Sequence, residues 1–146
     1  MNRVFSSLHA RALCHATEDL DKVKTAIMNA VGEADLNITY GEGHHGNPIE
    51  ILEAAIEVED GIIGFFERFD RADIENLRRT LNARVDDGCN LFVKVDKQSA
   101  FKGLIKLGSG DDVISVRIKI RAFPARVALA QEVADEFLAH LTKTND

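Results

Sequence analysis

Hydrophobic and polar residues alternate along several stretches of the chain, which is the period of a strand with one buried face. The clearest example is Ile-Ser-Val-Arg-Ile-Lys-Ile-Arg at residues 114–121, in which isoleucine and valine point one way and the polar residues point the other. Short apolar runs bounded by turn residues indicate the remaining strands. The predicted strands span residues 4–14, 37–40, 49–58, 91–95, 102–107 and 114–122.

Apolar residues at helical spacing predict four helices, with a further short turn or helix at residues 96–101. Thr17 is the predicted N-cap of the first helix and Gly32 its predicted C-cap. Pro124 is predicted at the first position of the last helix, where its missing N–H is tolerated. The predicted inward residues are, helix by helix, Leu20, Val23, Ile27 and Val31; Ile62, Phe65, Phe66 and Phe69; Ile74, Leu77 and Leu81; and Val127, Ala130, Ala134, Phe137, Leu138 and Leu141.

The order of these elements predicts the fold class. Consecutive strands joined by short loops favour an α+β fold with a mainly antiparallel sheet and helices packed on one face. The glycine-rich residues 108–112 predict a hairpin between the last two strands. A chain of 146 residues has the usual size of one domain, so we expect residues 1–146 to form a single domain. The other sheet face would then meet solvent or a ligand.

Charge is distributed unevenly along the chain. The net charge of −6 argues against nucleic acid as a partner, because phosphate binding needs clustered cations. Residues 91–126, however, carry eight Lys or Arg and three acids, a net charge of +5, whereas the other 110 residues sum to −11. This asymmetry predicts one surface for an anionic partner, with chance clustering as the alternative.

The predicted RNA-contacting surface is the open sheet face. Arg117, Lys119 and Arg121 share one side of their strand. Phe92 lies on the same side as Lys94 and would offer a stacking surface to unpaired bases. An ordinary solvated sheet face is the alternative. The candidate RNA-contacting cations are Lys94, Lys97, Lys102, Lys106, Arg117, Lys119, Arg121 and Arg126, with Arg11 as a further candidate.

The loop Gly43-His44-His45-Gly46 is a second candidate for RNA contact. Its glycine spacing resembles the GxxG loop with which one RNA-binding module clamps a nucleic-acid backbone. That module places the loop between helices, whereas here it lies between predicted strands. A plain flexible turn is therefore the alternative interpretation.

The sequence shows no catalytic or metal-binding motif. The two cysteines, Cys14 and Cys89, lie far apart, and there is no CxxC, HExxH or Walker pattern. We therefore predict a protein that is not an enzyme and needs no metal or cofactor. No apolar run has the length of a membrane span or of a signal peptide, so we expect a cytoplasmic protein that does not contact membranes.

A family resemblance is carried by RALCHATED at residues 11–19, EGHHGNPI at residues 42–49 and DKQSAF at residues 96–101, continued through residues 111–114 to residues 123–125. In these segments the chain resembles a family of small archaeal proteins described as predicted RNA-binding or exosome-associated proteins. The resemblance implies a fold like that of the ribosomal protein that binds 5S RNA. It also implies RNA, and exosome or ribosomal components, as partners, and it implies no enzyme chemistry.

Two other functions stay open at this stage. The open sheet face would form a homodimer if it were flat and rimmed by apolar residues, and the protein would then be an interaction module. A small enzyme would use His15, His44 or His45 as an acid or base near neutral pH. A deep pocket that gathers those histidines would favour the enzyme.

Overall fold

The computed structural model describes residues 3–42 and 46–144. Along the chain the elements are β1 (Phe5–His15), α1 (Leu20–Val31), β2 (Leu36–Glu42), β3 (Pro48–Ile56), α2 (Glu59–Glu67), α3 (Arg71–Arg79), α4 (Leu81–Arg84), β4 (Asn90–Asp96), α5 (Lys97–Phe101), β5 (Val113–Ile120) and α6 (Val127–Thr144). Strands and helices segregate into two layers, so the predicted α+β class is confirmed.

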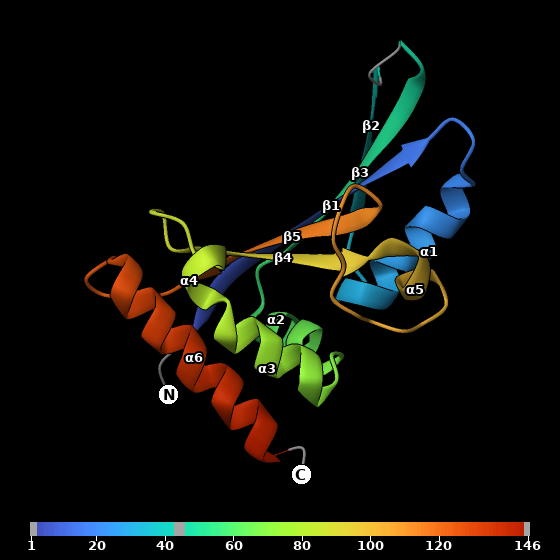
Figure 1. The fold of residues 1–146 in the computed structure, drawn as a ribbon. Helices are drawn as coiled ribbons and strands as arrows, with labels where there is room; N and C mark the ends of the chain where they lie inside the picture. The colour runs from blue at the N-terminus through green and yellow to red at the C-terminus, as the bar shows by residue number, and fades with distance from the viewer. Residues whose placement is uncertain (1–2, 43–45, 145–146) are drawn as a thin grey trace.

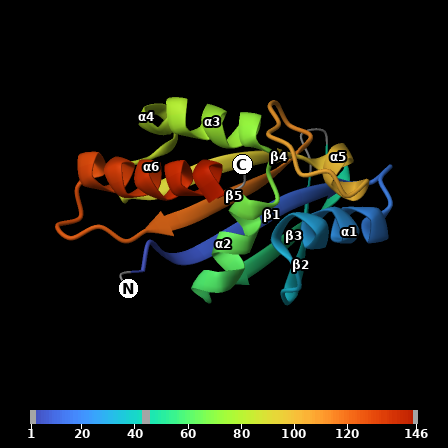
Figure 2. The same cartoon turned by 90° about the horizontal axis from the view of Figure 1, so that it is seen from below.

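The five strands of the described chain form one antiparallel sheet in the order β2-β3-β1-β5-β4. Helices lie below the sheet in Figure 1, and the view from below in Figure 2 places them in front of it. The opposite face of the sheet is open. The first strand therefore occupies the centre of the sheet, with β3 on one side and β5 on the other.

Strand alternation sorts the side chains of β5 between the two faces. Ile114, Val116, Ile118 and Ile120 are all buried against the helices, as predicted. The same hydrophobic core contains Val23 and Ile27 of α1 and Leu138 and Leu141 of α6, which are buried too, while Phe137 of α6 is half-buried. The ring of Phe5 stacks on Phe66 of α2 with centroids 5.1 Å apart and meets the Phe137 ring edge-on at 5.0 Å. These contacts fix α2 and α6 to the start of β1.

The predicted strand at residues 102–107 is wrong, and so is its hairpin with β5. Asp96 caps α5 by accepting from the Ser99 N–H at 2.9 Å, and the helix ends before Gly103, whose φ is 88°. The chain then returns along the free edge of β4, where Asp96 N donates to Lys106 O at 2.9 Å and Gly108 N donates to Lys94 O at 2.8 Å. β4 and β5 pair directly, and the return segment covers an edge strand that would otherwise be open.

Two predicted helix starts are displaced. Asp19 caps α1, because its carboxylate accepts from Asp21 N at 2.9 Å, whereas Thr17 lies two residues earlier in the turn. The last helix begins at Val127, so Pro124 belongs to the loop before it. Gly32 ends α1 as predicted: its φ is 87°, and its N–H donates to Met28 O at 2.8 Å.

Candidate nucleic-acid interface

The open face of β4, β5 and β1 gathers the cations that the sequence placed on alternate positions. Strand register aligns Phe92, Arg117 and His9 in one row across the three strands. The next row is Lys94, Ser115 and Arg11. Neighbouring strands lie about 4.8 Å apart and same-face residues about 6.7 Å apart, so these rows make a compact surface. We use the term basic face for the surface formed by Arg11, Lys94, Arg117, Lys119 and Arg121.

The five cations of the basic face are exposed. Lys119 Nζ donates to the carbonyl of Gly88 and stays at the surface. Among the described residues, none of Arg11, Lys94, Arg117 and Arg121 forms an ion pair. Their guanidinium and ammonium groups are therefore available to an anion, and an Arg fork also matches phosphate geometry.

Neutral side chains between the cations suit RNA bases. Phe92 of the edge strand β4 is 44% exposed beside Arg117, and its ring is a surface on which an unpaired base can stack. Ser7 and Ser115 supply hydroxyl groups on the same face. His9, also on this face, was not among the predicted site residues. The alternation of residues 4–14 contained it, but the sequence did not show that this strand lies beside β5.

Three predicted cations lie outside the basic face. Lys102 follows α5, Lys106 lies in the segment along the β4 edge, and Arg126 precedes α6. All three are exposed. They share no sheet face with Arg117, because the strand that was predicted to carry Lys102 and Lys106 does not form.

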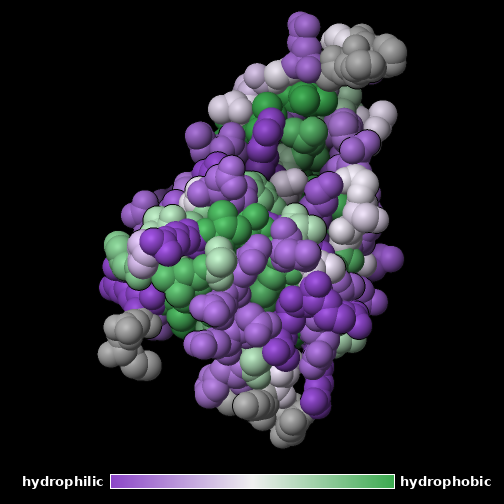
Figure 3. Space-filling model, turned by 60° about the vertical axis from the view of Figure 1, so that its left-hand side comes forward, coloured by the Kyte–Doolittle hydropathy of each residue, from purple (hydrophilic) through white to green (hydrophobic). Residues whose placement is uncertain are grey.

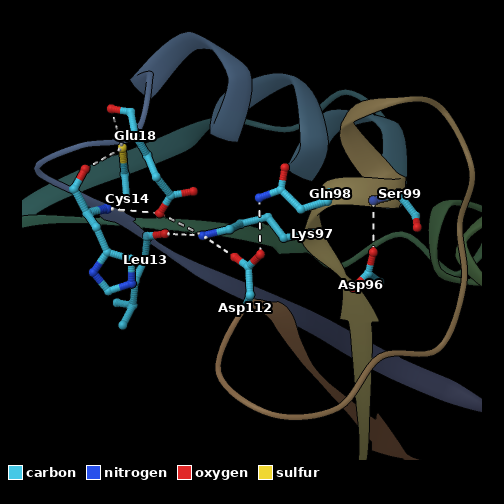
Figure 4. Close-up of polar contacts among 9 residues, drawn as sticks. Leu13, Cys14, Glu18, Asp96, Lys97, Gln98, Ser99 and Asp112 are labelled. Carbon is cyan, nitrogen blue, oxygen red and sulfur yellow. Dashed lines mark hydrogen bonds and ion pairs between the residues drawn. The ribbon is translucent and has the colours of Figure 1, made fainter.

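Lys97 is a buried structural cation rather than a surface one. Its side chain is 3% exposed, and Nζ lies 2.9 Å from Leu13 O, 3.0 Å from Glu18 Oε1 and 3.0 Å from Asp112 Oδ1 (Figure 4). All three N–H donors of the ammonium group are thus satisfied. Figure 4 shows the cluster joining β1, the turn before α1, α5 and the loop before β5.

The pKa of one carboxyl group in this cluster and that of a neighbouring thiol are shifted. Burial alone would raise the pKa of the Asp112 carboxyl, but hydrogen bonds from Lys97 and Gln98 outweigh it and hold that pKa below its ordinary value. Burial, with the nearby charges of Glu18 and Glu50, raises the pKa of the Cys14 thiol. Cys14 therefore stays protonated and is a poor nucleophile.

The remaining predicted site residues belong to the loop between β2 and β3. Gly43, His44 and His45 lie outside the described residues. Gly46 is described: it is exposed, its φ is 76°, and a β-carbon there would meet nothing within 4 Å. Within residues 3–42 and 46–144, no group of three or more His, Cys, Asp or Glu side chains is arranged to hold a metal ion. No helix in those residues has the length and apolar character of a membrane span.

The structure therefore defines an α+β protein whose sheet has one open face rich in cations. A family model described as RNA binding matches residues 7–120. The match covers more than half of the chain, so this chain belongs to that RNA-binding family. The matched residues include β4, β5 and most of β1, and they contain four of the five cations of the basic face.

Individual archaeal relatives agree with the family assignment. The chain is 31% identical over 142 residues to a Pyrococcus abyssi protein named RNA-binding protein PAB1135, covering 90% of this chain and 92% of the relative. It is 32% identical over 132 residues to the uncharacterized protein MJ0213 of Methanocaldococcus jannaschii, covering 82% and 87%. The crystal structure of protein AF2318 from Archaeoglobus fulgidus, of the DUF54 family, superposes with a TM-score of 0.82 at 30% identity, covering 91% of this chain and 99% of that one. The predicted likeness to the ribosomal protein that binds 5S RNA stays a prediction.

Proposed function

We propose that this protein binds single-stranded RNA through the basic face, without catalysing a reaction. One observation carries the proposal: Arg11, Lys94 and Arg117 come from three neighbouring strands and converge on the open side of the sheet. Membership of the RNA-binding family supports RNA as the anion. The exposed ring of Phe92 among these cations favours unpaired bases over a duplex, whose bases are already stacked.

Phosphate contacts should dominate the affinity. If the basic face neutralises about four to six phosphates, the logarithm of the affinity falls with the logarithm of the salt concentration at a slope of roughly −3 to −4. Fluorescence anisotropy with a labelled single-stranded RNA measures this slope. A wild-type protein that ignores RNA at low salt would contradict the proposal.

A matched pair of triple variants locates the interface. Replacing Arg11, Lys94 and Arg117 together by Gln should flatten the salt slope by about two units, because each lost phosphate contact contributes about 0.7. The control replaces Lys102, Lys106 and Arg126 by Gln, which changes the net charge equally at exposed positions off the basic face. Thermal stability should change little in both, because exposed cations contribute little to folding. Equal losses of affinity in the two variants would show a diffuse electrostatic effect and no localised interface.

A homodimer through the open face is the second candidate. Leu13 of β1 pairs with Ile51 of β3, and the neighbouring Ile49 pairs with His15, so an apolar strip borders the basic face. Light scattering at several protein concentrations, with and without RNA, distinguishes the two functions. A dimer that RNA dissociates would place both partners on one face. The exosome and ribosomal components stay predicted partners, because they rest on the family resemblance alone.

A further inference from the structure

A groove of about 860 Å³ lies at the end of the sheet where β1 begins and β5 ends. One wall is a single face of α6, which supplies Leu129, Val133 and Phe137 at helical spacing. The other walls are residues 3–4, just before β1, and residues 121–123, after β5. Figure 3 brings this end of the molecule forward and shows hydrophobic surface bordered by hydrophilic residues. The volume lies within the range of small-ligand pockets, which is about 300–1,000 Å³.

The lining of the groove suits a flat aromatic ring carried on an anionic chain. Leu129, Val133 and Phe137 make part of its wall apolar, and Phe123, which also lines the groove, is 82% exposed, so that its ring is available for stacking. Charged and polar groups stand at the rim: Arg3 and Arg121 as cations, Glu136 as an acid, and His140. A nucleobase combines an apolar face with hydrogen-bonding edges, so it matches this combination better than a purely aliphatic ligand does.

Arg121 connects the groove to the basic face. It continues the alternation of Arg117 and Lys119 one step past the end of β5, about 6.7 Å beyond Lys119, and it also lines the groove. Its backbone is held in place because Arg121 N donates to Val4 O at 2.7 Å. An RNA strand whose phosphates follow β5 would therefore arrive at the groove.

We propose that this groove receives an unpaired base of the RNA strand that lies on the basic face. The inference rests on the proposed function and adds a base-binding site to a surface that otherwise contacts phosphates. Charge complementarity at Arg3 and Arg121, together with continuity with the basic face, selects RNA over a peptide or a second copy of this chain as the occupant.

The test compares an oligouridylate with an abasic ribose-phosphate strand of the same length, each titrated against wild type and Phe123→Ala. The variant should bind the oligouridylate at least about five-fold more weakly, the lower end of what a base stacked on an aromatic ring contributes. Its affinity for the abasic strand and its salt slope should not change. Tyr40→Ala is the matched control, because Tyr40 is 81% exposed near the other end of the sheet. That control should bind both strands like wild type.

The other outcomes each contradict the proposed base-binding groove, and they can be distinguished from one another. If Phe123→Ala binds both strands like wild type, with the same salt dependence, the base-binding groove is contradicted and the proposed function is not. If the wild-type protein binds neither strand, both the base-binding groove and the proposed function are contradicted. A Phe123→Ala variant that turns a dimer into a monomer without losing RNA affinity would make a second copy the occupant. Photo-crosslinking with 4-thiouridine gives an independent readout: crosslinks should appear on the tryptic peptide of residues 122–126, and their restriction to other peptides would contradict the proposal.

Discussion

Lys94 and Lys97 are three residues apart in the sequence and have opposite environments. Lys94 points from β4 to the open face, where it is exposed and forms no ion pair with any described residue. Lys97 begins α5, is 3% exposed and has three oxygen partners. Lys97 has the opposite strand parity to Lys94, so alternation already directs it inward, and α5 begins at this residue after the cap at Asp96. Cations of one local cluster in the sequence therefore divide between the exposed sheet face and a buried ion-pair cluster.

This comparison predicts a large loss of stability for Lys97→Met. The substitution keeps the aliphatic stem but leaves the Leu13 carbonyl without its donor and the Glu18 and Asp112 carboxylates without their cation. We expect the free energy of unfolding to fall by about 2–3 kcal/mol, the cost of unsatisfied groups in a charged hydrogen-bond cluster. Urea denaturation measures it.

Lys102→Met is the matched control, since Lys102 is exposed just beyond the same helix, and it should change stability by less than about 0.5 kcal/mol. The RNA affinity of the folded Lys97→Met protein should equal that of wild type. A weakened affinity without a loss of stability would reverse the roles assigned to Lys94 and Lys97.

A smaller, pH-dependent effect is expected for Asp112→Asn. The pKa of Asp112 is lowered in the folded protein, so its contribution to stability is present above the unfolded-state pKa of about 3.9 and is lost as the pH falls through the folded-state pKa. The variant should be less stable than wild type at pH 7 by no more than about 1 kcal/mol, because a side chain that is 54% exposed is screened by solvent.

The gap between Asp112→Asn and wild type should narrow as the pH falls below about 4, and it should close only below the lowered folded-state pKa of Asp112, where both proteins carry a neutral side chain. Thermal unfolding from pH 3 to pH 7 tests this. A stability difference that is constant over that range would mean that Asp112 acts through packing or through hydrogen bonds that do not depend on its charge.

Alternation was sufficient to predict which face of β5 is buried, because a one-residue error would have moved Arg117 into the core. It was not sufficient at residues 102–107, where a short apolar run suggested a strand. There the Asp96 cap and Gly103 favour a helical turn followed by a return along β4. Local propensity cannot reveal that the edge of β4 needs covering, because this depends on the assembled sheet.

The candidate site was predictable only in part for the same reason. Arg117 and Lys119 belong to β5, and Arg121 continues their alternation just past its end, so their common face follows from the sequence. Arg11 and His9 join them because β1 lies beside β5, a pairing between residues about one hundred positions apart. The groove along α6 also depends on how distant segments pack. Sequence spacing therefore predicts the cations that follow one another along β5. The tertiary structure shows which residues of β1 and β4 join them on the basic face.

The smallest effect sharpens the border of the basic face. Glu53 of β3 lies directly opposite Arg11, so its carboxylate opposes the approach of a phosphate to that side of the sheet. Two charges about 10 Å apart in water interact by about 0.4 kcal/mol, so Glu53→Gln should raise RNA affinity about two-fold at low salt. Glu67→Gln, at the end of α2 in the helical layer, is the control and should leave affinity unchanged. Anisotropy titrations should show the gain of Glu53→Gln fading as salt approaches 0.5 M, because screening then acts within roughly 4 Å. An equal gain in both variants would mean that RNA affinity depends on the net charge of the whole molecule. It would contradict the inference that Glu53 of β3 marks the limit of the RNA-binding surface.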